Sequence, residues 1–125
     1  MKAENSSVGI GIDLIKISRL ANLIDNKRFI ERVFTSREIE HASGYRLRLV
    51  HLAGRWAAKE AVSKALGCGI SAELSWKDIE IINDENGRPA AYLSAEAGKV
   101  HNNPTISLSI SHDGNYATAI ALIMK

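Results

Sequence analysis

The sequence predicts an α+β fold in which a small antiparallel sheet packs against one long helix. Three observations lead to this class: an apolar strand near the N-terminus, a long helical segment, and two pairs of short strand-like segments after it. Because each pair is joined by a short polar turn, the paired strands are expected to run antiparallel. A chain of 125 residues, 46% of them hydrophobic, is expected to form a single domain over residues 1–125.

The N-terminal third is predicted to contain one strand and two helices. Residues 8–15, VGIGIDLI, have the apolar density of a short buried strand. A short helix is expected next, with Ser18 as its N-cap. Its apolar positions recur at helical spacing: Ile17, Leu20, Ala21 and Ile24. A second helix begins at the segment FTSRE, where Thr35 and Glu38 form the pattern of a capping box.

The strongest helical segment covers residues 46–66, which are rich in Leu, Ala, Lys, Arg and Glu. Gly67 is placed to end this helix in a left-handed conformation. One face is expected to enter the core, since its apolar residues follow a helical period: Leu49, Leu52, Ala53, Trp56, Ala57 and Ala61.

The C-terminal half is predicted to contain two hairpins separated by a short helix. Residues 78–82 and 90–93 form the first hairpin, and Asn86 with Gly87 favours a tight turn between them because both tolerate positive φ. A helix over residues 95–100 follows. Alternating Ile106, Leu108 and Ile110 indicate a strand, which a loop over residues 111–115 joins to a last strand over residues 116–123.

The net charge of +2 gives no argument for binding nucleic acid or an anionic membrane. Residues 16–32, the basic segment, contain five Lys or Arg against two acids, whereas residues 70–89 have a local charge of −3. The basic segment is either an ordinary solvated helix face or a dock for an acidic partner. The longest apolar run is too short to span a membrane, the first residues lack a targeting pattern, and Cys68 is alone, so we expect a cytoplasmic protein.

Three features of the sequence are candidates for chemistry, and each also has a plainer interpretation. Asp13 lies in an apolar strand, where its carboxylate needs either a salt bridge or a metal ion. Glu60 and Lys64 project from one helix face, either as a surface ion pair or as part of a Mg²⁺ and phosphate site that includes Arg55 and Lys59. His112 is either a plain loop residue or a phosphate donor. Sequence patterns of a zinc hydrolase or a P-loop NTPase are absent.

Taken together, five segments resemble holo-acyl-carrier-protein synthase, the small trimeric class of 4′-phosphopantetheinyl transferases. These segments are GIGIDLIKISR, VFTSREIE, GRWAAKEAVSKALG, NDENGRP and SISHDGNYATAIAL, and in order and spacing they cover nearly the whole chain. Such enzymes transfer the 4′-phosphopantetheine arm of coenzyme A to a serine of an apo acyl carrier protein and release adenosine 3′,5′-bisphosphate. The resemblance therefore implies a transferase.

The resemblance also implies roles for single residues. Asp13 and Glu60 would ligate Mg²⁺. Glu60, either directly or through a bound water, would be the candidate for removing the serine proton. Lys64 would lie against the phosphates and stabilise charge on the leaving group. Positions that hold coenzyme A would be Arg55, Lys64, Asn86, Gly87, Arg88, Pro89 and His112. In this class the site lies between neighbouring subunits of a homotrimer, so some contacts are expected from an adjacent chain.

The resemblance also implies a partner for the basic segment. Acyl carrier proteins are strongly acidic, and enzymes of this class bind them on their first helix. Arg19 and Arg28 match the docking arginines, and Phe29 offers an apolar contact beside them. Two positions depart from the family pattern: Cys68 stands where Thr is common, and Leu47 stands where some relatives carry a basic residue. Arg46 and Arg48 are the candidates to substitute for that residue.

Two alternatives compete with the transferase. A Mg²⁺-dependent nucleotide phosphohydrolase would share Asp13, Glu60 and Lys64 but would use water as its nucleophile, and it does not explain the basic segment. A non-catalytic adaptor that binds acyl carrier protein would need only Arg19 and Arg28. The adaptor hypothesis does not explain why Asp13 lies in an apolar strand.

Overall fold

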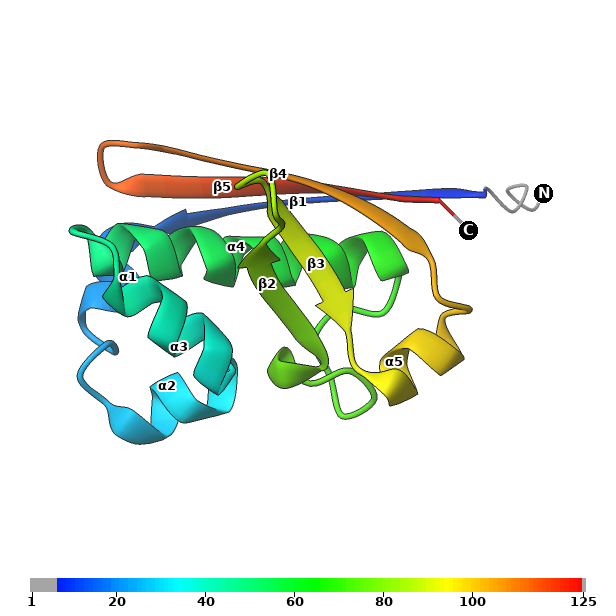
Figure 1. Cartoon of the computed structure of the whole chain (residues 1–125), viewed down its shortest axis with the longest axis horizontal. Coiled ribbons are helices and arrows are strands. Elements are labelled where there is room, and N and C mark those ends of the chain that lie inside the picture. The colour runs from blue at the N-terminus through cyan, green and yellow to red at the C-terminus, as the bar shows by residue number, and fades with distance from the viewer. Residues whose placement is uncertain (1–6, 125) are drawn as a thin grey trace.

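The computed structural model describes residues 7–124 and contains a three-stranded antiparallel sheet that lies along one side of a long helix, α4 (Arg48–Leu66) (Figure 1). In this sheet β1 (Val8–Lys16) and β4 (Thr105–Asp113) both pair with the central strand β5 (Tyr116–Met124). The predicted α+β class with antiparallel pairing is confirmed.

The remaining elements lie against the other side of α4 or at its flank (Figure 1). They are α1 (Ile17–Ala21), α2 (Lys27–Val33), α3 (Ser36–Ser43), a 3-10 turn (Trp76–Asp78), the antiparallel pair β2 (Ile79–Asn83) and β3 (Pro89–Leu93), and α5 (Ala95–Val100). Within residues 7–124 no helix is both long and apolar enough to cross a membrane. The expectation that the chain lacks a targeting signal concerns its first residues, and residues 1–6 lie outside the described part of the structure.

The strand β1 packs directly on α4 because two glycines face the helix. A Cβ atom at Gly11 would overlap the carbonyl oxygen of Ala61, and one at Gly9 would overlap that of Ala65. The opposite face of β1 is exposed: Ile10 is 65%, Ile12 62% and Leu14 63% accessible. The expectation of a buried strand is therefore wrong for half of its side chains, since α4 covers only one face of this sheet.

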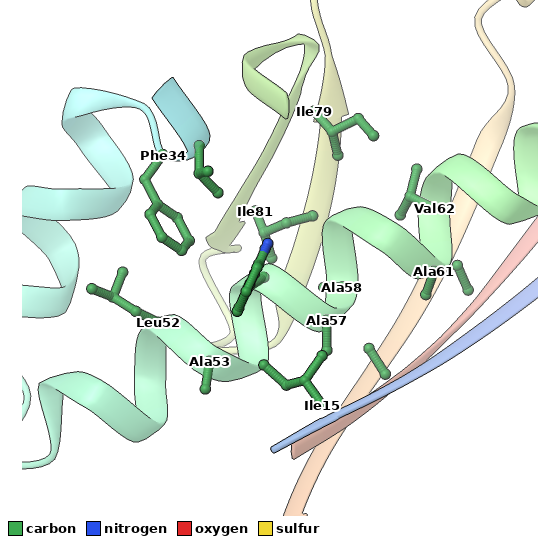
Figure 2. Close-up of a cluster of buried hydrophobic side chains, with 14 of the residues drawn as sticks. Ile15, Phe34, Leu52, Ala53, Ala57, Ala58, Ala61, Val62, Ile79 and Ile81 are labelled. Carbon is green, nitrogen blue, oxygen red and sulfur yellow. The ribbon is translucent and has the colours of Figure 1, made fainter. Parts of the chain in front are cut away.

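The core is built around the small residues of α4 (Figure 2). Of its predicted core positions, Leu49 is partly buried and the rest are buried: Leu52, Ala53, Trp56, Ala57 and Ala61. The helix begins at Arg48 rather than at residue 46, and Gly67 ends it with a φ of 89°, as predicted. Alanines along this helix allow the sheet on one side and the α1–α3 helices on the other to approach its backbone closely.

Two predictions for the helices after β1 are wrong. Ser18 does not cap α1; instead its backbone N–H donates to Oδ1 of Asn115 at 2.9 Å, and Asn115 Nδ2 donates to the Ser18 hydroxyl at 3.0 Å. The helix ends at Ala21, so Ile24 lies outside it. In addition, α2, whose N-cap is Asn26, was not predicted from the sequence. All of these errors involve short helices, whose ends depend on tertiary partners more than on propensity.

The capping box at the start of α3 is confirmed. Thr35 Oγ1 accepts from the backbone N–H of Glu38 at 3.2 Å, and Glu38 Oε1 accepts from that of Thr35 at 2.8 Å. Ser94 caps α5 in the same way, accepting from the backbone N–H of Ala97.

Both predicted hairpins are present, with changes in their turns. In the β2–β3 turn Gly87 has a φ of 78°, whereas Asn86 is not left-handed, and Asp84 Oδ1 accepts from the backbone N–H groups of Asn86 and Arg88. In the second hairpin the predicted loop over residues 111–115 is wrong. His112 belongs to β4 and pairs with Ala117, so the connection contains only residues 114 and 115.

Candidate active site

The Asp13 carboxylate lies between β1 and α4, where a lysine of α4 pairs with it. Its side chain is 15% exposed, and Oδ1 lies 3.1 Å from Nζ of Lys64. Lys64 Nζ also donates to the carbonyl oxygen of Ile12 at 3.0 Å. On the other side of β1, Thr118 Oγ1 donates to the Asp13 carbonyl at 2.7 Å. In this structure, therefore, the compensation that Asp13 needs in its apolar strand comes from Lys64.

Glu60 is partly buried on α4, one turn before Lys64. Burial, and then the negative charge of Asp13, raises the pKa of Glu60, while Lys64 and Arg19 oppose the shift. The three residues predicted from the sequence to act together therefore interact with one another. A carboxylate with a raised pKa is a better proton acceptor than an ordinary one near neutral pH.

Asp13 and Glu60 are also the residues that could hold a metal ion. No group of three or more His, Cys, Asp and Glu within residues 7–124 is arranged to hold one. Two acidic side chains nevertheless suit Mg²⁺, which is usually held by one or two carboxylates and completes its shell with water and substrate oxygens. The repulsion that raises the pKa of Glu60 is what a bound cation would relieve, so the residues fit this ion.

Lys59 does not belong to this cluster, contrary to the expectation that it would help to neutralise phosphate. Its side chain is fully buried and its Nζ lies 2.7 Å from Oε1 of Glu38. The same ammonium donates to the carbonyl oxygens of Trp76 and Ile79. Glu38 Oε2 in turn accepts from the backbone N–H of Ile81. Lys59 thus joins α3, α4 and the start of β2 inside the core.

A cavity of about 480 Å³ lies at the other end of the predicted site. It is lined by four of the seven residues expected to hold coenzyme A: Arg55, Gly87, Pro89 and His112. Asn86 and Arg88 are exposed in the turn and do not line it, and Lys64 lies with Asp13. The chain therefore carries two separate groups of the predicted residues.

Arg55 is the buried charge of this cavity, with 7% of the residue exposed. Its Nη2 donates to Oδ1 of Asn83 at 2.6 Å, and its Nε is buried without a partner. Desolvation is the main cause that lowers the pKa of Arg55, and Tyr45 and Glu38 oppose it. Among the ion pairs of residues 7–124 none involves Arg55. A guanidinium in this state is suited to receive an anion.

The cavity contains residues that the sequence analysis did not assign to a site. Tyr45, His51 and Asn83 line it, together with Arg46 and Leu47, the position that departs from the family pattern. The rings of Tyr45 and His51 are stacked with centroids 3.9 Å apart. The one sequence signal for Asn83 as a site residue is its position directly after a predicted strand and before the Asn-Gly turn.

Two of the three expected docking residues contact one aromatic side chain of α4. The Arg19 guanidinium lies 5.4 Å from the ring centroid of Trp56, and the ring of Phe29 meets the same ring edge-on at 5.5 Å. Arg19 and Arg28 are exposed, whereas Phe29 is partly buried. Two arginines and the edge of an aromatic cluster therefore face solvent on the side formed by α1 and α2.

Comparison with known proteins gives consistent results over nearly the whole chain. A relative from Protochlamydia amoebophila, described as holo-[acyl-carrier-protein] synthase, is 45% identical over 118 residues, which cover 93% of this chain and 97% of that protein. The crystal structure of Helicobacter pylori holo-[acyl-carrier-protein] synthase in complex with coenzyme A is 36% identical with a TM-score of 0.83, covering 91% of this chain and 98% of that one.

A third comparison extends the likeness to a more distant sequence. The structure of holo-[acyl-carrier-protein] synthase from Neisseria meningitidis has a TM-score of 0.85 at 30% identity, covering 94% of this chain and 98% of that one. The sequence model of the 4′-phosphopantetheinyl transferase superfamily matches residues 9–121. With its fold, its motifs and this match in agreement, the chain belongs to the 4′-phosphopantetheinyl transferase superfamily.

Proposed function

We propose that this chain, as a single domain over residues 1–125, transfers 4′-phosphopantetheine from coenzyme A to a serine of apo acyl carrier protein. The observation that carries the proposal is the pair of sites on one helix. A buried guanidinium that forms no ion pair with a described residue and has an unpartnered Nε suits a nucleotide phosphate, and a cluster of two carboxylates and a lysine suits the transfer itself. The relatives named holo-[acyl-carrier-protein] synthase support this activity over most of their length.

In the proposed reaction Glu60 accepts the proton of the carrier serine, and the serine oxygen attacks the β-phosphorus of coenzyme A. The bond from that phosphorus to the bridging oxygen breaks, and adenosine 3′,5′-bisphosphate leaves with the electron pair. Lys64 stabilises the charge that develops on the leaving group, because its half-exposed ammonium can reach substrate from the edge of the site. Burial raises the pKa of Glu60 in the metal-free protein, which favours proton acceptance, whereas a bound cation would oppose this effect.

Asp13 and Glu60 are the residues that would hold Mg²⁺. The bound ion would neutralise charge on the pyrophosphate oxygens of coenzyme A. Asp13 is suited to this position because Gly11, two residues earlier, lets β1 pack closely against α4, near enough for the charge of Asp13 to act on Glu60.

We infer that the enzyme works as a homotrimer with sites completed by adjacent subunits. Two features support association: the carboxylate cluster and the nucleotide cavity are separate in one protomer, and the outer face of β1 and β5 is apolar. Exposed side chains on this face are Ile10, Ile12, Leu14, Ile120, Leu122 and Met124. A face of this kind is a typical interaction surface, and the resemblance to the trimeric class favours three copies.

Docking of the carrier is assigned to Arg19 and Arg28, with Phe29 as an apolar neighbour. Opposite charges mainly raise the association rate and orient the partners, so the Michaelis constant for the carrier should rise with salt. We place the enzyme in the cytoplasm, where a single free Cys68 stays reduced.

The test is the intact mass of an apo acyl carrier protein incubated with coenzyme A, Mg²⁺ and this protein. We expect one phosphopantetheine adduct per carrier, lost in Asp13→Ala and Glu60→Ala. Absence of an adduct with the wild-type protein would refute the transferase and favour the hydrolase or the adaptor. An undiminished adduct with both variants would refute the metal assignment. Light scattering should give three times the 13.6 kDa chain mass, and an active monomer would contradict the shared site.

A further inference from the structure

The Arg55 guanidinium is held by a neutral partner rather than by a carboxylate. Its Nη2 donates to the amide oxygen of Asn83 at 2.6 Å, and Arg55 forms no ion pair with any described residue. An aspartate at residue 83 would fix the guanidinium equally well but would neutralise its charge. An asparagine fixes the orientation and leaves the full positive charge for a ligand.

A second contact fixes the amide of Asn83 in turn. Asn83 Nδ2 donates to the hydroxyl oxygen of Tyr45 at 3.1 Å, so its oxygen must face Arg55. Because the Tyr45 hydroxyl accepts from Asn83, its own proton is free to point toward Nε2 of His41, 3.5 Å away. The Tyr45 ring is also stacked on His51 with an interplanar angle of 26°. These contacts form one directed chain from the guanidinium to the end of α3.

The ring of His51 adds no competing charge to this wall of the cavity. Burial, followed by Arg55 and His41, lowers the pKa of His51 to about 4, so the imidazole is neutral at physiological pH. The lining therefore presents its positive charge through Arg55 and Arg46. Nε of Arg55 remains buried and unpartnered, which is costly unless a ligand pairs with it.

We propose that Asn83 and Tyr45 are positioning residues that hold the Arg55 guanidinium for a phosphate monoester bound in the cavity, the chemical class to which the 3′-phosphate of coenzyme A belongs. This inference rests on the proposed function for the identity of the ligand. Through the orientation and the charge of Arg55, Asn83 and Tyr45 would select a nucleotide that carries a 3′-phosphate over the same nucleotide without it.

The test compares the binding of adenosine 3′,5′-bisphosphate and adenosine 5′-monophosphate by calorimetry, without any transfer step. Asn83→Asp should weaken bisphosphate binding about tenfold or more, the effect of losing one charge-assisted hydrogen bond, and should leave monophosphate binding within about twofold. Tyr45→Phe removes one neutral hydrogen bond and should weaken only bisphosphate binding, by about two- to fivefold. Asn102→Asp is the charge control, since it adds the same charge at an exposed position outside the cavity.

The outcomes separate this inference from the proposed function. Equal losses for both nucleotides in Asn83→Asp and Tyr45→Phe, or no loss for either, would overturn the positioning roles. A protein that discriminates the two nucleotides as expected but forms no carrier adduct would retain the positioning roles and refute the transferase. Thermal melting of both variants checks folding, and Tyr45→Phe, which keeps the stacked ring, provides the decisive comparison if Asn83→Asp is unstable.

Discussion

Lys64 Nζ lies 3.1 Å from Asp13 Oδ1, so the lysine expected to contact phosphate is the counter-ion of the aspartate expected to bind metal. An ammonium and a metal ion both need lone pairs of the same carboxylate. Lys64 also donates to the carbonyl oxygen of Ile12, which holds the ammonium beside β1. A metal ion at Asp13 would therefore compete with Lys64, and a substrate phosphate would give the released ammonium another partner.

Lys64→Met should tighten the binding of a divalent cation to the protein without nucleotide. Release of a partly exposed ion pair is worth about 0.2–1 kcal/mol, so Mn²⁺ affinity should rise by a factor of about 1.4 to 5. The free Mn²⁺ signal in electron paramagnetic resonance measures it. Arg19→Gln is the control, because Arg19 also acts on the charge of Glu60 but has no contact with Asp13. If both variants raise Mn²⁺ affinity equally, the cause is a general change in charge, and the proposed competition between Lys64 and the metal ion for Asp13 is wrong.

Lys59→Met should destabilise the fold strongly. It removes the ammonium but leaves the fully buried carboxylate of Glu38 without its counter-ion, which typically costs about 3–5 kcal/mol. Urea unfolding measures the change, and adding Glu38→Gln should recover part of it by removing the unpaired charge. Lys27→Met provides the matched control, since Lys27 and Glu31 form an exposed pair on α2. If the Lys59 and Lys27 variants lose similar stability, the ion pair in the core is not structural.

The candidate site could be predicted where a charged residue lies in an apolar segment. An aspartate in an apolar strand requires a partner, and the structure supplies one in Lys64. The cations of α4 were not separable by spacing alone: Lys59 and Lys64 both lie near Glu60 in sequence, but only Lys59 points into the core. Its buried partner Glu38 belongs to a capping box that looked complete by itself, so no local pattern revealed the long-range ion pair.

The fold could be predicted where the spacing of apolar residues and the residues that end or turn the chain indicate the same element, as in α4 and the two hairpins. The exposed face of β1 was not, because Ile10, Ile12 and Leu14 carry the same apolar signal whether a layer of the same chain or another molecule covers them. The cavity network was also hidden, since Asn83 and Tyr45 are far apart in sequence and their contact depends on how β2 meets the end of α3.

The stability of the protein should fall as the pH decreases from about 6.5 toward 4, partly because of His51. Burial, with Arg55 and His41, lowers the pKa of His51 from 6.5 to about 4 in the folded protein. Between these values the unfolded chain binds a proton that the folded protein does not, so protons favour unfolding. Urea unfolding at pH 7.5 and pH 5 should show a smaller loss for His51→Phe, which keeps a ring against Tyr45. Parallel losses in both proteins would refute this assignment.

Gly11→Ala should lower both stability and metal affinity, because it moves β1 away from α4. The added Cβ would overlap the carbonyl oxygen of Ala61 and lie 2.7 Å from the backbone nitrogen of Ala65, neither of which can rotate away. Overpacking of this kind typically costs about 1–3 kcal/mol. Asp13 follows two residues later on the same strand face, so its carboxylate should shift from Glu60, and Mn²⁺ binding measured well below the melting temperature should weaken. Gly44→Ala is the control, since a Cβ there lies 3.5 Å from its nearest neighbour at an ordinary φ of −79°. A Gly11→Ala protein as stable as the Gly44→Ala protein would show that β1 does not depend on this close approach.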